Sequence, residues 1–236
     1  MRGLPVETMQ AAIGATEADF SAAGTHAGPP GSGETWSVYA AEVSGRGTAW
    51  VYLDKDQRVR RVDNFSAAPL QPPESAEEAV AVAGDYLTKV GGPSTDGLTL
   101  RPTAGGDSKG RPAAVVWQKR QGLVWVPSGV TVQVARDGTV VGYQWIETPV
   151  TVSLEPAVTA AKAAASVRRD LKLGGIRKKS TVLEVLQIDP EGDGATTQYL
   201  VWNVALSLTG YSGPPGALAV VDALTGKVLA AERLVL

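Results

Sequence analysis

The stretch Val220-Val221-Asp222-Ala223-Leu224-Thr225-Gly226-Lys227-Val228 has the features of a tight β-hairpin. Two β-branched residues end one strand, Thr225-Gly226 provides a turn, and Val228 begins a return strand. Glycine suits such a turn because it adopts a positive φ angle without steric cost. The stretch therefore predicts a pair of antiparallel strands.

Two earlier stretches repeat this pattern. They are Trp50–Val59 and Thr131–Val140, each an apolar strand, a polar turn and a return strand. The return strands begin at Val59, Val140 and Val228, which are 81 and 88 residues apart. Because a predicted helix precedes each hairpin, the spacing predicts a repeated unit of one helix followed by several antiparallel strands.

Three stretches have apolar residues at helical spacing. The clearest begins at Ser75, which forms a capping box with Glu78, and it ends before Gly91. Its apolar stripe consists of Ala79, Val82, Ala83, Tyr86, Leu87 and Val90. A second helix is expected over Glu155–Leu173, and a third, interrupted by a glycine, over Pro5–Phe20.

Most other segments have β-branched and aromatic residues in short runs, which predicts strands. These segments are Trp36–Val43, Thr48–Leu53, Val59–Asn64, Leu98–Thr103, Ala113–Lys119, Leu123–Val126, Val130–Ala135, Thr139–Ile146, Thr181–Ile188, Tyr199–Leu208, Leu218–Val221 and Val228–Leu234. The sequence thus predicts an α+β fold of tandem units, each with one helix packed on an antiparallel sheet. The expected domains are a degenerate helix-plus-hairpin unit over residues 1–68 and full units over 69–149 and 150–236.

The hairpin at Val220–Val228 resembles the closing hairpin of PepSY modules, in which a strand, an Asp-Ala pair, a turn with glycine and a Lys-Val return follow one another. In that family a helix lies over an antiparallel sheet. The tandem arrangement is similar to the YpeB-like and YcdB/YcdC-like envelope proteins of Gram-positive bacteria. Two copies depart from the pattern: Gln57-Arg58 stands where glycine is expected, and Ala135-Arg136-Asp137 replaces the Asp-Ala pair.

PepSY modules occur in propeptides of secreted metallopeptidases and in envelope proteins that restrain or position hydrolases, and they have no catalytic residues to carry over. The resemblance implies a non-catalytic, extracytoplasmic binding module that inhibits, chaperones or positions a secreted peptidase or a cell-wall hydrolase. Its protein partner is expected to bind at an exposed sheet edge or strand face. A structural or sensory ectodomain of a membrane-anchored envelope protein is one alternative, and a carboxylate-based hydrolase is another.

The composition is that of an ordinary globular protein, with 44% apolar and 19% charged residues. A net charge of −2 gives no overall field toward nucleic acid, so no nucleic-acid partner is expected. The absence of cysteine excludes disulfides, thiolate nucleophiles and sulfur-ligated metals. Met1–Glu7 has no apolar run, so it is expected to be neither a signal peptide nor a membrane anchor. Either the protein is cytoplasmic, or such a segment lies outside these 236 residues.

Two motifs are weaker candidates for ligand sites. His26 is the sole histidine, which excludes a two-histidine metal site, and it is expected to be a solvated loop residue. Asp189–Gly194 resembles a calcium loop, but Leu200 stands where a bidentate glutamate would close the coordination shell. A polar loop is the expected structure there, and no cofactor or metal is predicted.

Two sets of residues are candidate contact surfaces. The basic cluster consists of Arg168, Arg169, Lys172, Arg177, Lys178 and Lys179. Its charges are favoured by the dipole at a helix C-terminus, and a patch for an anionic ligand is the alternative. The aromatic set on predicted strands consists of Trp117, Trp125, Tyr143 and Trp145. These rings are expected in the core, with a partner-contact face as the alternative.

Overall fold

The computed structural model describes residues 5–64, 72–101, 111–189, 196–209 and 216–233. The chain divides into two compact units. Unit 1 comprises Met1–Lys119 and Ser128–Thr148, and unit 2 comprises Arg120–Pro127 and Pro149–Leu236. The expected boundary at residues 68–69 lies outside the described residues, and the expected segment 150–236 lies in unit 2. Helices pack on a mostly antiparallel sheet, so the predicted α+β class is confirmed.

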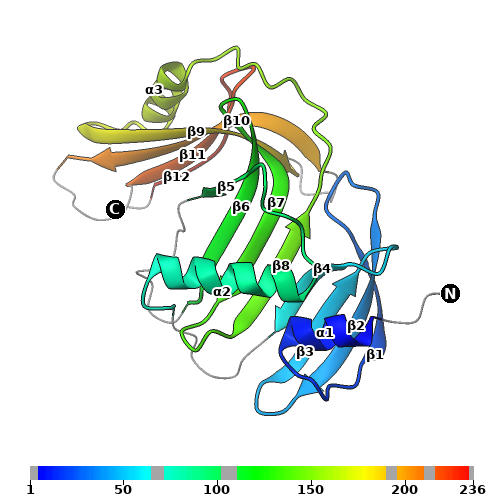
Figure 1. The fold of residues 1–236 in the computed structure, drawn as a ribbon. Helices are drawn as coiled ribbons and strands as arrows, with labels where there is room; N and C mark the ends of the chain where they lie inside the picture. The colour runs from blue at the N-terminus through cyan, green and yellow to red at the C-terminus, as the bar shows by residue number, and fades with distance from the viewer. Residues whose placement is uncertain (1–4, 65–71, 102–110, 190–195, 210–215, 234–236) are drawn as a thin grey trace. The chain divides into compact units, whose positions relative to one another are not determined.

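Unit 1 contains two helices on one face of a sheet (Figure 1). The helices are α1 (Val6–Ile13) and α2 (Ala76–Lys89). The strands are β1 (Ser21–Ala27), β2 (Thr35–Val43), β3 (Gly47–Leu53), β4 (Val59–Asn64), β5 (Leu98–Arg101), β6 (Ala113–Gln121), β7 (Val124–Val134) and β8 (Val140–Ile146). In space the order is β1-β2-β3-β4-β8-β7-β6-β5, and the chain of β6 and β7 continues into unit 2.

The core of unit 1 forms where the apolar stripes of the helices meet alternate residues of the strands. Met9 and Ile13 of α1 and Ala83 of α2 are essentially excluded from solvent, as are Val51 and Val132 of the sheet. Strand residues of one face recur with period two, so a single face can be apolar along each strand. This face holds both helices of the unit.

Unit 2 places one helix on a four-stranded antiparallel arrangement. Its elements are α3 (Ala160–Asp170), β9 (Ile176–Ile188), β10 (Thr197–Leu208), β11 (Ala217–Asp222) and β12 (Val228–Arg233). The strands follow one another in space in chain order, and β9 also pairs in parallel with the start of β7, through Trp125 and Glu184. Ala163 and Val167 of α3 pack against Leu206 and neighbouring residues of β10 and β11.

The Ser75 half of the predicted capping box of α2 is confirmed. The Ser75 hydroxyl accepts the N–H of Glu78 at 3.0 Å, which satisfies an N–H group that the first turn of a helix leaves without a partner. The Glu78 carboxylate accepts the N–H of Glu74 at 3.0 Å, one residue before the N-cap, in place of the N–H of Ser75. The predicted stripe is buried except for Val82, which is partly buried.

The two other helices are shorter than expected. Helix α1 ends at Ile13 because Gly14 adopts the left-handed conformation, with φ of 65°. Helix α3 begins only at Ala160, because Thr159 is its N-cap and accepts the N–H of Lys162. The residue before the cap, Val158, instead donates its N–H to the carbonyl of Ala223 in the β11–β12 turn.

Two strand predictions were wrong. Strand β1 was not predicted, because its sequence Ser-Ala-Ala-Gly-Thr-His-Ala has few residues that favour strands. Pairing with β2 makes it a strand, so His26 lies on a strand and not in a loop. The segments Leu123–Val126 and Val130–Ala135, expected as separate strands, form the single strand β7.

The three hairpins that define the sequence repeat have related turns, and the third turn is one residue longer than the other two. Each begins just after a register shift in the ladder: at Tyr52/Leu53, at Gln133/Val134 and at Val220/Val221. In each turn a residue with positive φ donates its N–H back to the first turn residue. These donors are Gln57, Gly138 and Gly226, and their acceptors are the carbonyls of Asp54, Ala135 and Asp222. The hairpin therefore repeats in the structure as well as in the sequence.

Candidate functional site

Strand β1 forms an open edge of the unit 1 sheet. All seven of its residues are exposed, and among the described strands its partner is β2. Edge strands are usually protected by charged residues or proline, and Ser21–Ala27 contains neither. Its irregularity is a register shift between Ala22 and Gly24. The edge therefore presents backbone groups that another strand can pair with.

An aromatic cluster lies beside this edge. The His26 ring stacks on Trp36 at a centroid distance of 6.3 Å and meets Tyr52 edge-on at 5.4 Å. Trp36 is almost fully buried, and its indole N–H donates to the Glu34 carboxylate at 2.9 Å. The cluster fixes the end of β1 against the sheet and places an exposed imidazole at its border.

Two other strands end the described topology, β5 in unit 1, which contains Arg101, and β12 in unit 2. Strand β12 differs in character from β1. Its last four residues are exposed, and they include the charged pair Glu232 and Arg233. Charges of this kind discourage pairing with a further strand. Of β1 and β12, β1 is the less protected against pairing with a further strand.

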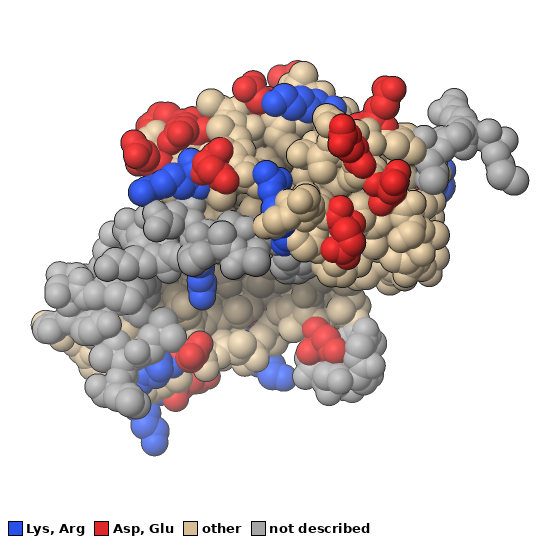
Figure 2. All heavy atoms as spheres, turned by 90° about the horizontal axis from the view of Figure 1, so that it is seen from below, with Lys and Arg blue, Asp and Glu red and all other residues tan. Residues whose placement is uncertain are grey.

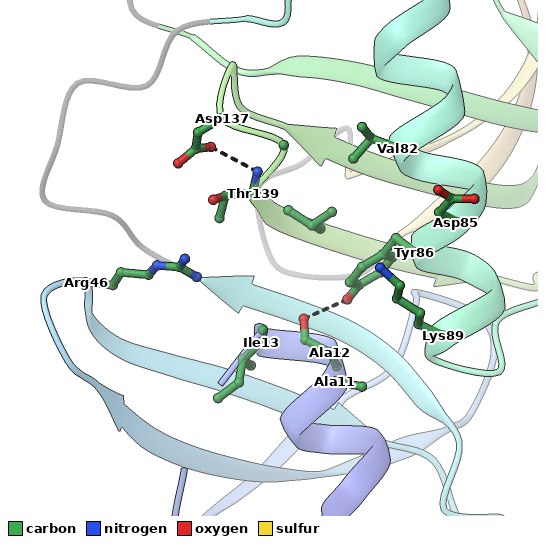
Figure 3. Close-up of a pocket in the computed structure, with 13 residues that line it drawn as sticks. Ala11, Ala12, Ile13, Arg46, Val82, Asp85, Tyr86, Lys89, Asp137 and Thr139 are labelled. Carbon is green, nitrogen blue, oxygen red and sulfur yellow. Dashed lines mark hydrogen bonds between the residues drawn. The ribbon is translucent and has the colours of Figure 1, made fainter. Parts of the chain in front are cut away.

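A cavity of about 370 Å³ lies within unit 1 (Figure 3). It is bounded by the end of α1, the last turns of α2, and the turns that join β2 to β3 and β7 to β8. Ala12, Ile13, Val82 and Val140 provide apolar walls, and the Tyr86 ring lies among them. Its size falls in the usual range for sites that bind small molecules.

Four charged side chains line the cavity. They are the cations Arg46 and Lys89 and the carboxylates Asp85 and Asp137. The backbone N–H of Thr139 donates to Asp137 at 2.9 Å and, together with the nearby charge of Arg46, lowers the pKa of that carboxyl. Asp137 is therefore ionised at neutral pH, and the cavity holds charges of both signs.

A buried arginine lies in another part of unit 1. The Arg60 side chain is 1% exposed, and its Nη1 lies 3.2 Å from the Glu147 carboxylate. Its guanidinium also lies 4.2 Å from the centroid of the Trp145 ring. Asp54, which is 5% exposed, lies 3.9 Å from Nη1 and is bound at 3.0 Å by Arg58. This cluster joins three segments of the unit.

The structure places the predicted basic cluster at the end of α3 and the start of β9 in unit 2. Arg168, Arg169, Lys172 and Lys179 are exposed, while the side chains of Arg177 and Lys178 lie outside the described residues. Arg168 donates to the carbonyl of Leu173 at 3.2 Å, and Arg169 pairs with Asp170. Both contacts stabilise the C-terminal end of α3. An anionic ligand for this cluster stays a prediction.

The predicted aromatic set does not come together on one surface. Trp117, Tyr143 and Trp145 are 9%, 2% and 8% exposed and belong to the core of unit 1. Trp125 is half-buried in unit 2, where Arg120 lies over its ring at 5.5 Å. The burial of the first three agrees with the core packing expected for these rings.

Most of the loop at Asp189–Gly194 lies outside the described residues, so its predicted polar character stays a prediction. Among the described residues, no group of three or more histidine, aspartate or glutamate side chains is placed to hold a metal ion. Within the same ranges, no helix is long and apolar enough to cross a membrane. Figure 2 shows acidic and basic side chains on the same face of the molecule.

Neither the edge strand β1 nor the charged cavity was predicted from the sequence. The four cavity charges come from separate segments, around residues 46, 85–89 and 137, and no spacing rule links them. Asp137-Gly138 was recognised only as a turn. The signal for β1 is the segment between Gly14, which ends α1, and the glycine- and proline-rich stretch that follows Ala27, because it leaves room for one short strand.

No protein-family model and no curated protein matches the chain. Among solved structures, the chain is similar to the Bacillus megaterium YpeB C-terminal domain. The TM-score is 0.56 and the sequence identity is 11%, over 96% of this chain and 94% of that one. The likeness lies in the fold, and it confirms the resemblance to YpeB-like proteins that the sequence predicts.

Proposed function

We propose that the chain is a non-catalytic binding module of the bacterial cell envelope that inhibits, chaperones or positions a secreted peptidase or a cell-wall hydrolase. The YpeB-like fold supports this function, because PepSY-type modules accompany such enzymes. The observation that carries the proposal is the open, uncharged edge at β1.

The mechanism is addition of a strand to the sheet. An extended segment of the partner pairs with Ser21–Ala27 through main-chain hydrogen bonds, which provide affinity. Side chains of that segment alternate between the two faces, so those on one face near His26 lie beside the aromatic cluster of His26, Trp36 and Tyr52. The cluster then provides selectivity for the partner.

The test uses purified secreted peptidases and cell-wall hydrolases from the source organism. Binding to the immobilised chain is measured by biolayer interferometry, and hydrolysis rates are measured with peptide and peptidoglycan substrates. At least one enzyme is expected to bind and to change its rate severalfold. If none of these enzymes binds or changes rate, the proposed function is wrong.

Edge variants locate the contact. Ala22→Lys with Thr25→Lys places charges on β1 and is expected to weaken binding at least about tenfold. The matched control is Ala231→Lys on the exposed part of β12, which is expected to leave binding unchanged. Weakening by the control alone would assign the contact to β12 and contradict the role of β1.

A further inference from the structure

We infer that the charged cavity of unit 1 binds a small zwitterion of the class of a free α-amino acid or a dipeptide. This inference does not rest on the proposed function, because it concerns a different surface from β1 and a different kind of ligand.

Two cations line the cavity from opposite sides. Arg46 comes from the β2–β3 turn and Lys89 from the last turn of α2. Figure 3 shows them on opposite sides of the cavity, with their charged ends turned inward. An arginine and a lysine on two sides of a space of this size suit a carboxylate, which accepts hydrogen bonds at both oxygens.

The carboxylate of Asp137 provides the complement for an ammonium group. It lies on the Arg46 side of the cavity (Figure 3), and its lowered pKa keeps it charged. A ligand carboxylate held by Arg46 and Lys89 therefore has an anionic group within the same cavity for its amine. A ligand with only a negative charge would bind only Arg46 and Lys89, and a ligand with only a positive charge would bind only Asp85 and Asp137.

Asp137 is held in its turn by the N–H of Thr139, and Lys89 lies in the last turn of α2, but Arg46 is not explained by the end of α1. The last four carbonyls of a helix lack intrahelical partners, and a nearby arginine often satisfies them. In α1 all four are already occupied. Gln10 and Ala11 accept from the backbone of Ala15 and Gly14, Ala12 accepts from Tyr86, and Ile13 accepts from Asn64.

The cationic side chains are also available for a ligand. Within the described residues, the side chains of Arg46, Asp85 and Lys89 make no hydrogen bond or ion pair. Arg46 is nevertheless half-buried, with its Nη1 close to Gly14. The charge of Arg46 acts on the nearby Asp137 carboxylate, but a half-buried guanidinium that makes no hydrogen bond still gains from binding a carboxylate.

The floor of the cavity is apolar. It is formed by Ala11, Ala12, Val82 and Val140, and the Tyr86 hydroxyl is engaged with Ala12. The site therefore recognises the two charged ends of the ligand, and the segment between them meets apolar side chains. Alanyl-alanine has the two charges and the small apolar side chains that such a site suits.

The experiment is an NMR titration of the ¹⁵N-labelled chain with three probes: L-alanyl-L-alanine, its N-acetyl derivative and its C-terminal amide. The amide signals of Gly14 and Gly138, which line the cavity, report binding. The dipeptide is expected to bind with a dissociation constant of about 1 mM or lower. Each blocked probe is expected to bind at least about tenfold more weakly.

Variants test the residue assignments. Arg46→Gln and Lys89→Gln are each expected to weaken dipeptide binding about tenfold or more. Asp137→Asn is expected to weaken the dipeptide but not the N-acetyl probe, because only the former carries an ammonium group. The control is Lys55→Gln, at an exposed position in the β3–β4 turn, which is expected to change nothing.

Three results would overturn the inference. The first is no shift of Gly14 or Gly138 with any probe up to about 20 mM. The second is equal affinity for the three probes, which would show that the charges are not recognised. The third is unchanged dipeptide binding in both Arg46→Gln and Lys89→Gln.

Discussion

The hydroxyl of Tyr86 donates a hydrogen bond to the carbonyl of Ala12 at 3.0 Å and thereby joins α2 to the last turn of α1. The side chain of Asn64 does the same from β4, since it donates to the carbonyls of Ile13 and Val140. Helix α1 has only 8 residues, which is too short to be stable on its own. Its position depends on these bonds and on its buried face.

Replacing Tyr86 by phenylalanine is expected to destabilise unit 1. The change removes the donor and leaves the Ala12 carbonyl buried without a partner, while the ring and its packing remain. The expected loss is about 1–3 kcal/mol in the free energy of unfolding, measured by urea denaturation.

The matched control is Tyr39→Phe on β2, where the ring is partly buried against the same core. Its expected effect is below about 0.5 kcal/mol. Equal losses in the two variants would show that the Tyr86 hydroxyl bond has no special role.

Alkaline pH is expected to destabilise unit 1 through the same residue and its neighbour. Burial raises the pKa of Tyr86 well above its usual value of 10.0, and burial likewise raises the pKa of Tyr143. Above pH 10 the two tyrosine hydroxyls lose their protons in the unfolded chain but keep them in the folded chain. Folding stability is therefore complete below pH 10 and falls as the pH rises, by up to about 1.4 kcal/mol per pH unit for each tyrosine.

Urea denaturation between pH 9 and pH 11 measures this slope. The double variant with Tyr86→Phe and Tyr143→Phe is expected to be less stable at pH 9 but to show a flatter dependence above pH 10. An unchanged slope in the double variant would assign the alkaline loss to other groups.

The fold was predictable where local signals and packing agree. Ser75 and Glu78 form the expected cap, and the expected strand Val59–Asn64 has the bounds of β4. Prediction failed where tertiary contacts decide. Strand β1 has little strand propensity and forms by pairing with β2. Residues 155–158 were expected in the helix but lie outside α3, because the N–H of Val158 donates to the carbonyl of Ala223.

The charged cavity was beyond sequence analysis for a related reason. Arg46 and Asp137 belong to two hairpin turns that are 91 residues apart, and only the folded sheet brings both to the end of α1. Neither residue belongs to a motif. A single charged residue in a turn is usually exposed to solvent, so the sequence alone does not mark it as part of a site.

Replacing Arg60 by lysine is expected to be costly, although the charge is kept. The guanidinium lies over the Trp145 ring and reaches Glu147 at the same time, whereas an ammonium group has no planar face and loses more hydration when buried. The expected loss is about 1–3 kcal/mol in urea denaturation. The control Arg61→Lys changes a pair with Asp63 that is 33% exposed at the arginine and is expected to cost less than about 1 kcal/mol.

Gln57 occupies the position that glycine fills in the two equivalent hairpins, with φ of 64° against 78° at Gly138. A side chain is strained in this conformation, and the buried Gln57 Oε1 has no hydrogen-bond partner among the described residues. Gln57→Gly is therefore expected to stabilise unit 1 by about 0.5–1 kcal/mol, once the cost of the extra chain entropy of glycine in the unfolded state is subtracted.

The reciprocal change, Gly138→Gln, adds a Cβ that meets nothing within 4 Å, so backbone strain alone should destabilise unit 1 by about 1 kcal/mol. Thermal denaturation measures both changes. A destabilising Gln57→Gly or a stabilising Gly138→Gln would contradict the equivalence of the two turns.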